Sequence, residues 1–521
     1  MQLQSADRVA ERAAEERIYD RTPRWGRRFG VAFLLFVLLI VGGFYAWTAR
    51  GRSGLARQVA AYRAAGEPIE MSDFIVHGVA DADNAALALK EAAAAIDEKS
   101  DVWKVYDHFD EPFALPLHAE ETTAIRDAVA ANTAAFPHVD EAMRRKGIDW
   151  KIKYVSPGIQ TLLPDLHAQR QLANLVVARA RLNYQDGDHA AAIADLRRAA
   201  FIGRAVGHHP FLVGHLVAIA INATTCEALN EMSPGLKIGT SAGDARAADV
   251  NALIADLLDD KPARQSYRLG IYGERMAQLD TARCVADGRL SLATLTGGGL
   301  GAGPNPVASV ATFAARPIAL SDGQIMLEHT TARLRAFEAS PDWPTYQTKA
   351  PPYPADVADT MVIHVLAKVM LPSLDRATQS HFRNTADRRL AATALAVRRY
   401  ALDHAGKLPP TLDELVPAYL PAVPLDPFAR GGKQPLKYVA DPAKPRLYSV
   451  GDDGADNAGS ELVSLANARR TKLSRWDKLD AVVHLTAQPR EPVNEPEGAD
   501  SDAAADAPPT TSPAKSPADP R

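Results

Sequence analysis

Residues 29 to 49 read FGVAFLLFVLLIVGGFYAWTA, a run of 21 uncharged and mostly apolar residues between Arg28 and Arg50. An α-helix of about 20 apolar residues is long enough to cross a hydrocarbon core ~30 Å thick. The run is longer than the apolar stretch of a cleaved signal peptide, and it ends with Tyr45 and Trp47, aromatic residues suited to a membrane interface. The sequence therefore predicts an uncleaved transmembrane helix at residues 29 to 49.

Positive charge on the two sides of this span predicts its orientation. The arginines before the span are Arg17, Arg21, Arg24, Arg27 and Arg28, and those closely after it are Arg50, Arg52, Arg57 and Arg63. Positive residues are enriched on the cytoplasmic side of membrane proteins, so this excess places residues 1–28 in the cytoplasm. We therefore predict a single-pass protein of the inner (cytoplasmic) membrane, with the bulk of the chain extracytoplasmic.

Length and composition bound the rest of the fold. The chain has 521 residues and a net charge of -4, and no basic face with interleaved aromatics that would indicate a nucleic-acid partner. Abundant alanine and only 7% aromatic residues favour helices that pack through small side chains. We predict a mainly α protein, with a helical extracytoplasmic domain at 50–371, an α+β module at 372–486 and a disordered, proline-rich tail at 487–521.

The clearest helical signal is LVVARARLNYQDGDHAAAIADLRRAAFIGRA at 175–205. Small and apolar residues at i, i+3 and i+4 flank the turn Asp186-Gly187-Asp188, in which Asp188 is placed to cap the second helix. This resembles one tetratricopeptide-type (TPR) hairpin, but no second copy follows one period later. We therefore predict a single TPR-like hairpin within an irregular helical domain. The glycine-rich stretch at 296–306 is expected to be a flexible loop, because it lacks the Gly-Lys-Ser/Thr ending of a phosphate-binding loop.

Further helices are expected from the same spacing of apolar residues. They cover 54–65, 81–98, 119–146, 164–185, 211–232, 244–285, 322–339, 355–370 and a long helix from about 372 to 404. Three short strands are expected near 436–440, 446–450 and 481–485. The module at 372–486 is therefore predicted to be a long helix on a small antiparallel sheet.

The order of features in this module is specific. LAATALAVRRYALDHAGKLPPTLDELVPAYLPAVPLDPFARGGKQPLKY, at 390–438, is followed by YSVGDDGADNAG, at 448–459. The chain here resembles the globular part of the major pseudopilin of type II secretion, in which a helix leads through a proline-rich segment to a Ser-x-Gly-x-Asp-Gly loop. The residues that carry the resemblance are Tyr400, Gly406, Pro409, Leu420, Pro421, Pro424, Asp426, Pro427, Gly432, Pro435, Ser449, Gly451, Asp453 and Gly454. Within the segment, Thr411 and Glu414 also predict a capping box.

The resemblance implies a calcium site in the loop. It carries most directly to Asp453, and Asp456 and Asn457 supply further oxygen atoms of the kind that calcium prefers. The spacing does not fit an EF-hand, and about 20 residues separate the loop from the next acidic residues, Asp477 and Asp480. A hydrated Asp/Gly turn without metal is the other interpretation.

The chain also departs from the pseudopilins. The span lacks their Phe-Thr-Leu-x-Glu opening, and about 320 residues separate it from the module, which is longer than any ordinary connector. Assembly into a pseudopilus filament is therefore not expected. Over most of its length the chain resembles a group of uncharacterised planctomycete-type single-pass membrane proteins, and this resemblance implies an architecture but no activity.

Two further groups of residues have side chains suited to chemistry. His208, His209 and His215 could contribute to a transition-metal site, although Pro210 interrupts them and His208 and His209 also suit a helix C-terminus. Cys226 and Cys284 could form one disulfide in an oxidising compartment, or remain two buried thiols. No serine-hydrolase motif occurs, and the sequence predicts no catalytic residue and no cofactor other than calcium.

Two functions are consistent with these features. The first is a membrane-anchored extracytoplasmic binding or scaffold protein, with protein partners in the cell envelope or its secretion machinery and none among nucleic acids. The alternative is an envelope metal-dependent hydrolase with a site in the helical domain around His208, His209 and His215.

Overall fold

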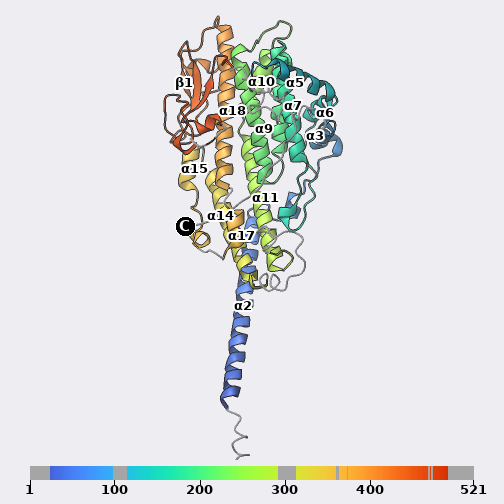
Figure 1. Cartoon of the computed structure of the whole chain (residues 1–521), viewed down its shortest axis with the longest axis vertical. Coiled ribbons are helices and arrows are strands. Elements are labelled where there is room, and N and C mark those ends of the chain that lie inside the picture. The colour runs from blue at the N-terminus through green and yellow to red at the C-terminus, as the bar shows by residue number, and fades with distance from the viewer. Residues whose placement is uncertain are drawn as a thin grey trace, which may run out of the picture. The chain divides into compact units, whose positions relative to one another are not determined.

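The computed structural model of the chain describes residues 24–97, 114–291, 313–359, 363–371, 374–467, 470 and 473–490 (Figure 1). The chain divides into one compact unit, Met1–Ala487, and a second unit, Gln488–Arg521. Most of the predicted cytoplasmic segment, the glycine-rich loop at 296–306 and the tail beyond residue 490 lie outside the described residues. The described helices and strands all belong to the first unit.

The apolar run forms part of one uninterrupted helix, α2, at Arg24–Ala64. Its first half projects from the helical body and exposes large apolar side chains, with Phe33 69% exposed and Leu39 73% exposed (Figure 1). From Gly51 onward, α2 packs against the body. One N-terminal helix is therefore long and apolar enough to cross a membrane, and the prediction of a helix at 29–49 is confirmed.

The body consists mainly of helices, as predicted. The α-helices after α2 are α3 (Ala85–Ala94), α5 (Ala119–Ala131), α6 (Ala135–Arg144), α7 (Asp165–Gln185), α8 (His189–Val206), α9 (Leu212–Met232), α10 (Ala247–Leu258), α11 (Lys261–Ala286), α14 (Arg316–Glu338), α15 (Trp343–Lys349), α16 (Ala355–Ala358), α17 (Val365–Met370) and α18 (Leu374–Asp403). Short 3-10 helices are η1 (Met71–Phe74), η2 (Asp81–Asp83), η3 (Gly158–Gln160), η4 (Ser233–Gly235), η5 (Leu412–Leu415), η6 (Leu465–Asn467) and η7 (Arg475–Asp477).

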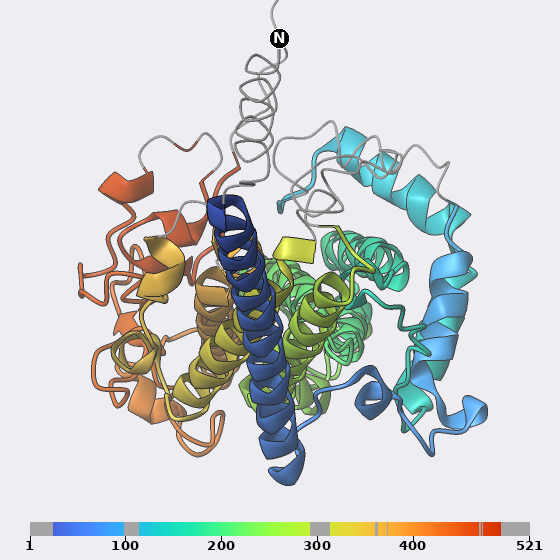
Figure 2. The same ribbon diagram turned by 90° about the horizontal axis from the view of Figure 1, so that it is seen from below.

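The helix α9 also has an apolar window long enough to cross a membrane, but it lies inside the body. Half of this window is buried, and α7, α8, α11 and α18 pack around it. Figure 2 looks along the body from below and shows α2 in front of α11 and α14, and α14 is the element against which α2 packs. The apolar character of α9 is therefore explained by core packing.

Some expected helices are divided in the structure. The stretch 244–285 forms α10 and α11, because Asp259 is extended, with ψ of 102°, and Pro262 stands in the first turn of α11. Similarly, 119–146 divides into α5 and α6, and 355–370 divides into α16 and α17, where His364 has a positive φ of 67°. Local breaks in the backbone therefore shorten helices that apolar periodicity alone extends.

The hairpin α7–α8 forms as expected around its turn. Gly187 has a φ of +87°, which glycine adopts without steric cost, and the Asp188 carboxylate accepts a hydrogen bond from Ala191 N at 2.9 Å. The two helices pack on each other and on α9. The likeness of this hairpin to a TPR unit stays a prediction.

The carboxy-terminal part contains the predicted long helix and small sheet. Strands β1 (Lys437–Val439), β2 (Arg446–Ser449) and β3 (Ala481–His484) form an antiparallel sheet in the order β1-β2-β3, with Leu447 opposite both Tyr438 and Val483. The helix α18 packs against β2. The predicted capping box is wrong, because Thr411 makes no side-chain cap and residues 412–415 form a 3-10 turn instead.

The helix α18 belongs to two packing arrangements at once. Besides β2 it packs against α9 and α10, and Leu390 and Leu395 share one core cluster with Leu172 of α7 and Leu447 of β2. The core is therefore continuous across residue 372, where the sequence predicts a domain boundary. The division into two domains stays a prediction.

Candidate functional site

The second half of α2 is packed along one face. Leu55, Val59 and Tyr62 share a helix face and are 2%, 4% and 8% exposed, and they form a cluster with Leu320 and Leu327 of α14. Close approach of the two helices depends on a glycine at residue 51, since a Cβ atom there would lie 3.0 Å from Leu320 Cβ. Burial of such a face contributes on the order of 5 kcal/mol. The packing therefore joins the exposed apolar half of α2 rigidly to the body.

A buried arginine strengthens this junction. The Arg275 side chain of α11 is fully buried, and its Nη1 donates to Glu67 Oε2 at 2.5 Å and to Thr331 Oγ1 at 3.1 Å. Its guanidinium lies 4.6 and 4.7 Å from the ring centroids of Tyr62 and Tyr272. A buried charge is tolerated only when it is paired and hydrogen-bonded, so Arg275 fixes the chain segment that follows α2.

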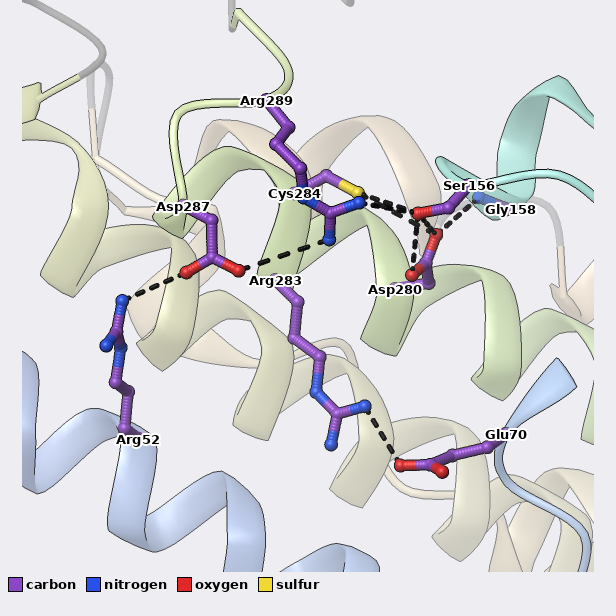
Figure 3. Close-up of polar contacts among 9 residues, drawn as sticks. All are labelled: Arg52, Glu70, Ser156, Gly158, Asp280, Arg283, Cys284, Asp287 and Arg289. Carbon is purple, nitrogen blue, oxygen red and sulfur yellow. Dashed lines mark hydrogen bonds and ion pairs between the residues drawn. The ribbon is translucent and has the colours of Figure 1, made fainter.

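A second polar network lies close to the point where α2 leaves the body (Figure 3). Arg52 of α2 binds Asp287 at 2.9 Å, just beyond α11, and Arg289 lies 4.0 Å from the same carboxylate. Arg289 also donates to Ser156 Oγ at 3.0 Å, and Ser156 Oγ donates to Asp280 Oδ2 at 2.9 Å. This network connects α2, α11 and the loop before η3.

Cys284 and Ser156 are the side chains of that network that could act as nucleophiles. The Cys284 Sγ lies 3.3 Å from Ser156 Oγ, and burial raises the pKa of the thiol, so the protonated form is favoured at neutral pH. The charged side chains drawn with them in Figure 3 are carboxylates and guanidinium groups. The network is therefore best explained as a structural connection. Both cysteines are free and buried, so of the two interpretations of the cysteines the structure contains the pair of buried thiols.

A groove of about 750 Å³ opens beside this junction. The segment after α2 contributes Phe74 and Ile75, and the extended chain before η3 contributes Trp150 and Tyr154. Ile75 is 53% exposed although it is apolar. Grooves of this size with aromatic walls are typical binding surfaces for other molecules.

The predicted calcium residues lie on the loop after β2. Asp453 Oδ1 accepts from Ala455 N at 2.9 Å, and Asp456 accepts from the Tyr448 hydroxyl at 2.9 Å and from Lys437 Nζ at 3.3 Å. The Asn457 side chain donates to Ala455 O. In the part of the chain that the structure describes, no group of three or more His, Cys, Asp and Glu side chains could hold a metal ion. Calcium binding stays a prediction.

Two other carboxylates, those of Asp426 and Asp480, hold this loop. Asp426 is fully buried and accepts from Val450 N and from Ser449 Oγ, both at 2.8 Å. Asp480 is also fully buried and accepts from Gly459 N at 2.8 Å. Burial raises the pKa of both carboxyl groups. The sequence named Asp426 among the residues of the pseudopilin resemblance, but nothing local indicated which distant amide it would bind.

The histidines of the helical domain have separate surroundings. His209 binds Val206 O through Nδ1 and stacks on Trp150, with ring centroids 4.5 Å apart. His215 instead lies 2.9 Å from Ser266 Oγ and 3.3 Å from His381 Nδ1, a partner that sequence reasoning missed. Burial lowers the pKa of His215 to about 3, so this pair is neutral and serves as packed polar core. Among the described residues, these histidines belong to no group of side chains that could hold a metal ion, and the metal-dependent hydrolase stays a prediction.

Comparisons with models of known families, with curated proteins and with solved structures find no match to this chain. The resemblance to the major pseudopilin, and that to planctomycete-type membrane proteins, therefore stay predictions from the sequence.

Proposed function

We propose that the chain is a single-pass, membrane-anchored protein that holds a helical body in a fixed orientation and binds or scaffolds other proteins of the cell envelope. In this proposal α2 spans the inner membrane, residues 1–28 lie in the cytoplasm and the body lies outside it. The single observation that carries the proposal is the division of α2 into an exposed apolar half and a packed half. Between the two halves the helix is continuous.

The exposed half supports anchoring. An exposed apolar helix of this length is unfavourable in water, because each large side chain transferred out of water contributes about 1.5–3 kcal/mol. Trp25 and Trp47 lie near its ends, and a helix rises about 33 Å over 22 residues, close to a hydrocarbon core ~30 Å thick. Aromatic side chains at both ends suit the two interfaces.

The packed half supports a scaffold role. A flexible tether would let the body turn freely above the membrane, whereas the apolar contact with α14 and the Arg275 pair fix the body on its anchor. The groove beside the junction, with exposed Ile75, then has a defined height and direction. Fixed presentation is useful to a protein that positions partners, and the described residues provide no assembled catalytic set that would favour an enzyme instead.

Anchoring is tested by fractionation of cells that express the full-length chain. We expect it to stay in the membrane pellet after an alkaline carbonate wash and to be released by detergent. Leu35→Arg/Leu39→Arg should shift it to the soluble fraction, because each arginine at the centre of a span costs about 2.5–3.5 kcal/mol. Leu465→Arg, at a side chain that is 96% exposed outside the span, is the matched control. Release of the unaltered chain without detergent would contradict anchoring.

The side of the membrane is tested by labelling a single introduced cysteine. Lys407→Cys places an exposed thiol after α18, and the two native cysteines are buried and give a low background. We expect a membrane-impermeant maleimide to label this thiol in intact spheroplasts. Labelling only after lysis would place the body in the cytoplasm.

Partner binding is tested by photo-crosslinking from the groove. A photoreactive residue at Ile75 should give a discrete adduct with an envelope protein in cells, and Val76→Asp should reduce the yield. The same residue at Leu402, which is 39% exposed near the end of α18, is the control for random collision. Equal adducts from both positions would contradict a partner surface at the groove.

A further inference from the structure

We infer that the base of the body binds the head groups of anionic phospholipids through four arginines around the exit of α2, Arg50, Arg52, Arg289 and Arg316, which we call the arginine collar. The inference rests on the proposed function, because it requires that α2 cross a bilayer. It adds a chemical class of partner to that function, since the collar would select lipids by charge.

The level of the collar is set by contacts between α2 and the start of α14. The ring of Phe313 stacks on Phe44 of α2, with centroids 4.9 Å apart and planes 19° apart. Phe44 belongs to the apolar run, so the body reaches down to the last turns of the span. At 1.5 Å per residue, Arg50 and Arg52 lie about 9–12 Å beyond Phe44 along the axis. This places them in the head-group layer when the hydrocarbon core ends near Phe44 and Trp47.

The two other arginines reach the same level from the body. Arg316 lies with its guanidinium 4.6 Å from the Phe313 ring centroid, and its Nη2 is 3.4 Å from the position a Cβ atom would take at Gly288. Arg289 follows in the same turn and approaches Asp287, which also binds Arg52. Arg52 and Arg289 are 56% and 52% exposed, so their guanidinium groups remain open to a ligand from the membrane side.

The charge balance of the collar favours an anion. Among the described residues that contact it, the carboxylates are Asp287 and, through Ser156, Asp280. Four positive groups and two negative groups leave a net charge of +2. A phosphate oxygen is a suitable acceptor, because guanidinium groups bind phosphates through paired, charge-assisted hydrogen bonds.

The bilayer around α2 is the source of phosphate that the geometry favours. Clusters of arginine next to a span attract anionic lipids, and the attraction falls off within a Debye length of the surface. The collar lies next to the exposed apolar half of α2, which suits lipid. A phospholipid head group therefore meets the collar without leaving its leaflet.

The test uses the full-length chain, reconstituted in vesicles of equal phosphatidylcholine and phosphatidylglycerol and then extracted in mild detergent. The ratio of the two lipids that co-purify is measured by mass spectrometry. We expect phosphatidylglycerol to be enriched several-fold over its share in the vesicle, and Arg289→Gln/Arg316→Gln to bring the ratio of the two lipids close to that of the vesicle. Arg289→Lys/Arg316→Lys, which keeps the charge, should retain most of it.

The control is Lys407→Gln/Lys433→Gln, which removes the same charge from exposed positions of the carboxy-terminal part. It should leave the enrichment unchanged, and thermal melts of all variants check that they fold. Enrichment that is equal in the unaltered chain and in Arg289→Gln/Arg316→Gln would overturn the inference. Failure of the proposed anchoring is seen separately, as release of the unaltered chain in the carbonate wash, before any lipid is measured.

Discussion

Buried charge holds both the junction of α2 and the carboxy-terminal sheet, but the partners of that charge differ. At the junction, Arg275 meets an opposite charge, Glu67, and two aromatic faces. At the sheet, Asp426 is surrounded by neutral donors, the N–H groups of Phe428 and Val450 and the Ser449 hydroxyl. Arginine stays charged at every accessible pH, whereas a carboxyl group titrates. The two regions should therefore respond differently to substitution, acid and cations.

The largest loss of stability is expected from a substitution at the junction between α2 and the body. Arg275→Met should lower the free energy of unfolding by about 3 kcal/mol, because it leaves Glu67 without its partner and removes the contacts with both tyrosine rings. Chemical denaturation of the detergent-solubilised chain measures this change. Arg246→Met, at an exposed arginine that pairs with Asp249, should change it by less than about 0.5 kcal/mol. Equal effects of the two variants would show that burial of Arg275 contributes nothing.

The next largest loss of stability is expected when the Asp426 carboxylate beside the sheet is removed. Asp426→Ala leaves two buried backbone N–H groups and one hydroxyl without an acceptor, so we expect a loss of about 2 kcal/mol. Asp453→Ala removes an exposed carboxylate from the same part of the chain and is expected to cost about 0.5 kcal/mol or less. The same denaturation experiment compares them. A larger loss for Asp453→Ala would reverse the assignment of which aspartate holds the loop.

A smaller effect is expected in the pH dependence of stability that Asp426 causes. Burial raises the folded-state pKa of Asp426 above its ordinary value of 3.8. Between 3.8 and the raised pKa the folded chain holds a proton that the unfolded chain has released, so the free energy of unfolding falls as pH rises through this interval. The contribution of Asp426 to the free energy of unfolding is thus fully present below pH 3.8 and is lost as pH rises through the folded-state pKa.

Asp426→Asn should therefore flatten the pH dependence of stability just above pH 3.8, relative to the unaltered chain. Lys407→Gln, at an exposed side chain, should leave the slope in this interval unchanged. Urea midpoints measured from pH 3.5 upward test both expectations. An unchanged slope in Asp426→Asn would mean that this carboxyl group has an ordinary pKa.

The smallest effect concerns calcium at the loop after β2. Because Asp453 and Asp456 already have hydrogen-bond partners, we expect millimolar calcium to raise the melting temperature by only about 1 °C or less. A rise of several degrees that Asp453→Ala abolishes and Asp73→Ala retains would support the calcium site predicted from the sequence. Asp73 is the control because it lies on η1, in another part of the chain.

Local sequence signals explain which parts of the fold could be predicted. The apolar run of α2, the Asp-Gly-Asp turn of the α7–α8 hairpin and the three strands each have a pattern within about 20 residues. The contact between Arg275 and Glu67 joins residues 208 apart, and that between His381 and His215 joins residues 166 apart. Contacts at such separations depend on how helices pack, and they leave no periodicity in the sequence.

The errors have an equally physical origin. The expected helix at 244–285 ignored Asp259-Asp260 and Pro262, which together end one helix and begin the next. The expected capping box relied on residue types at Thr411 and Glu414, but the Thr411 side chain makes no cap hydrogen bond to residues 412–415. The calcium site stays a prediction, and the hydrogen bonds of Asp426 and Asp480 to distant backbone groups could not be read from the residues beside them.

Because α2 continues without a break from its exposed half into the body, the number of residues in α2 sets the direction that the body faces around the helix axis. One residue inserted after Ala49 would turn everything beyond it by about 100° about the helix axis and raise it by about 1.5 Å. A neighbour in the membrane that recognises one side of the body would then be lost, and an insertion of seven residues, about 20° short of two full turns, would bring that side back. A protein whose body is joined to its anchor by a flexible linker would show no such dependence on the number of inserted residues.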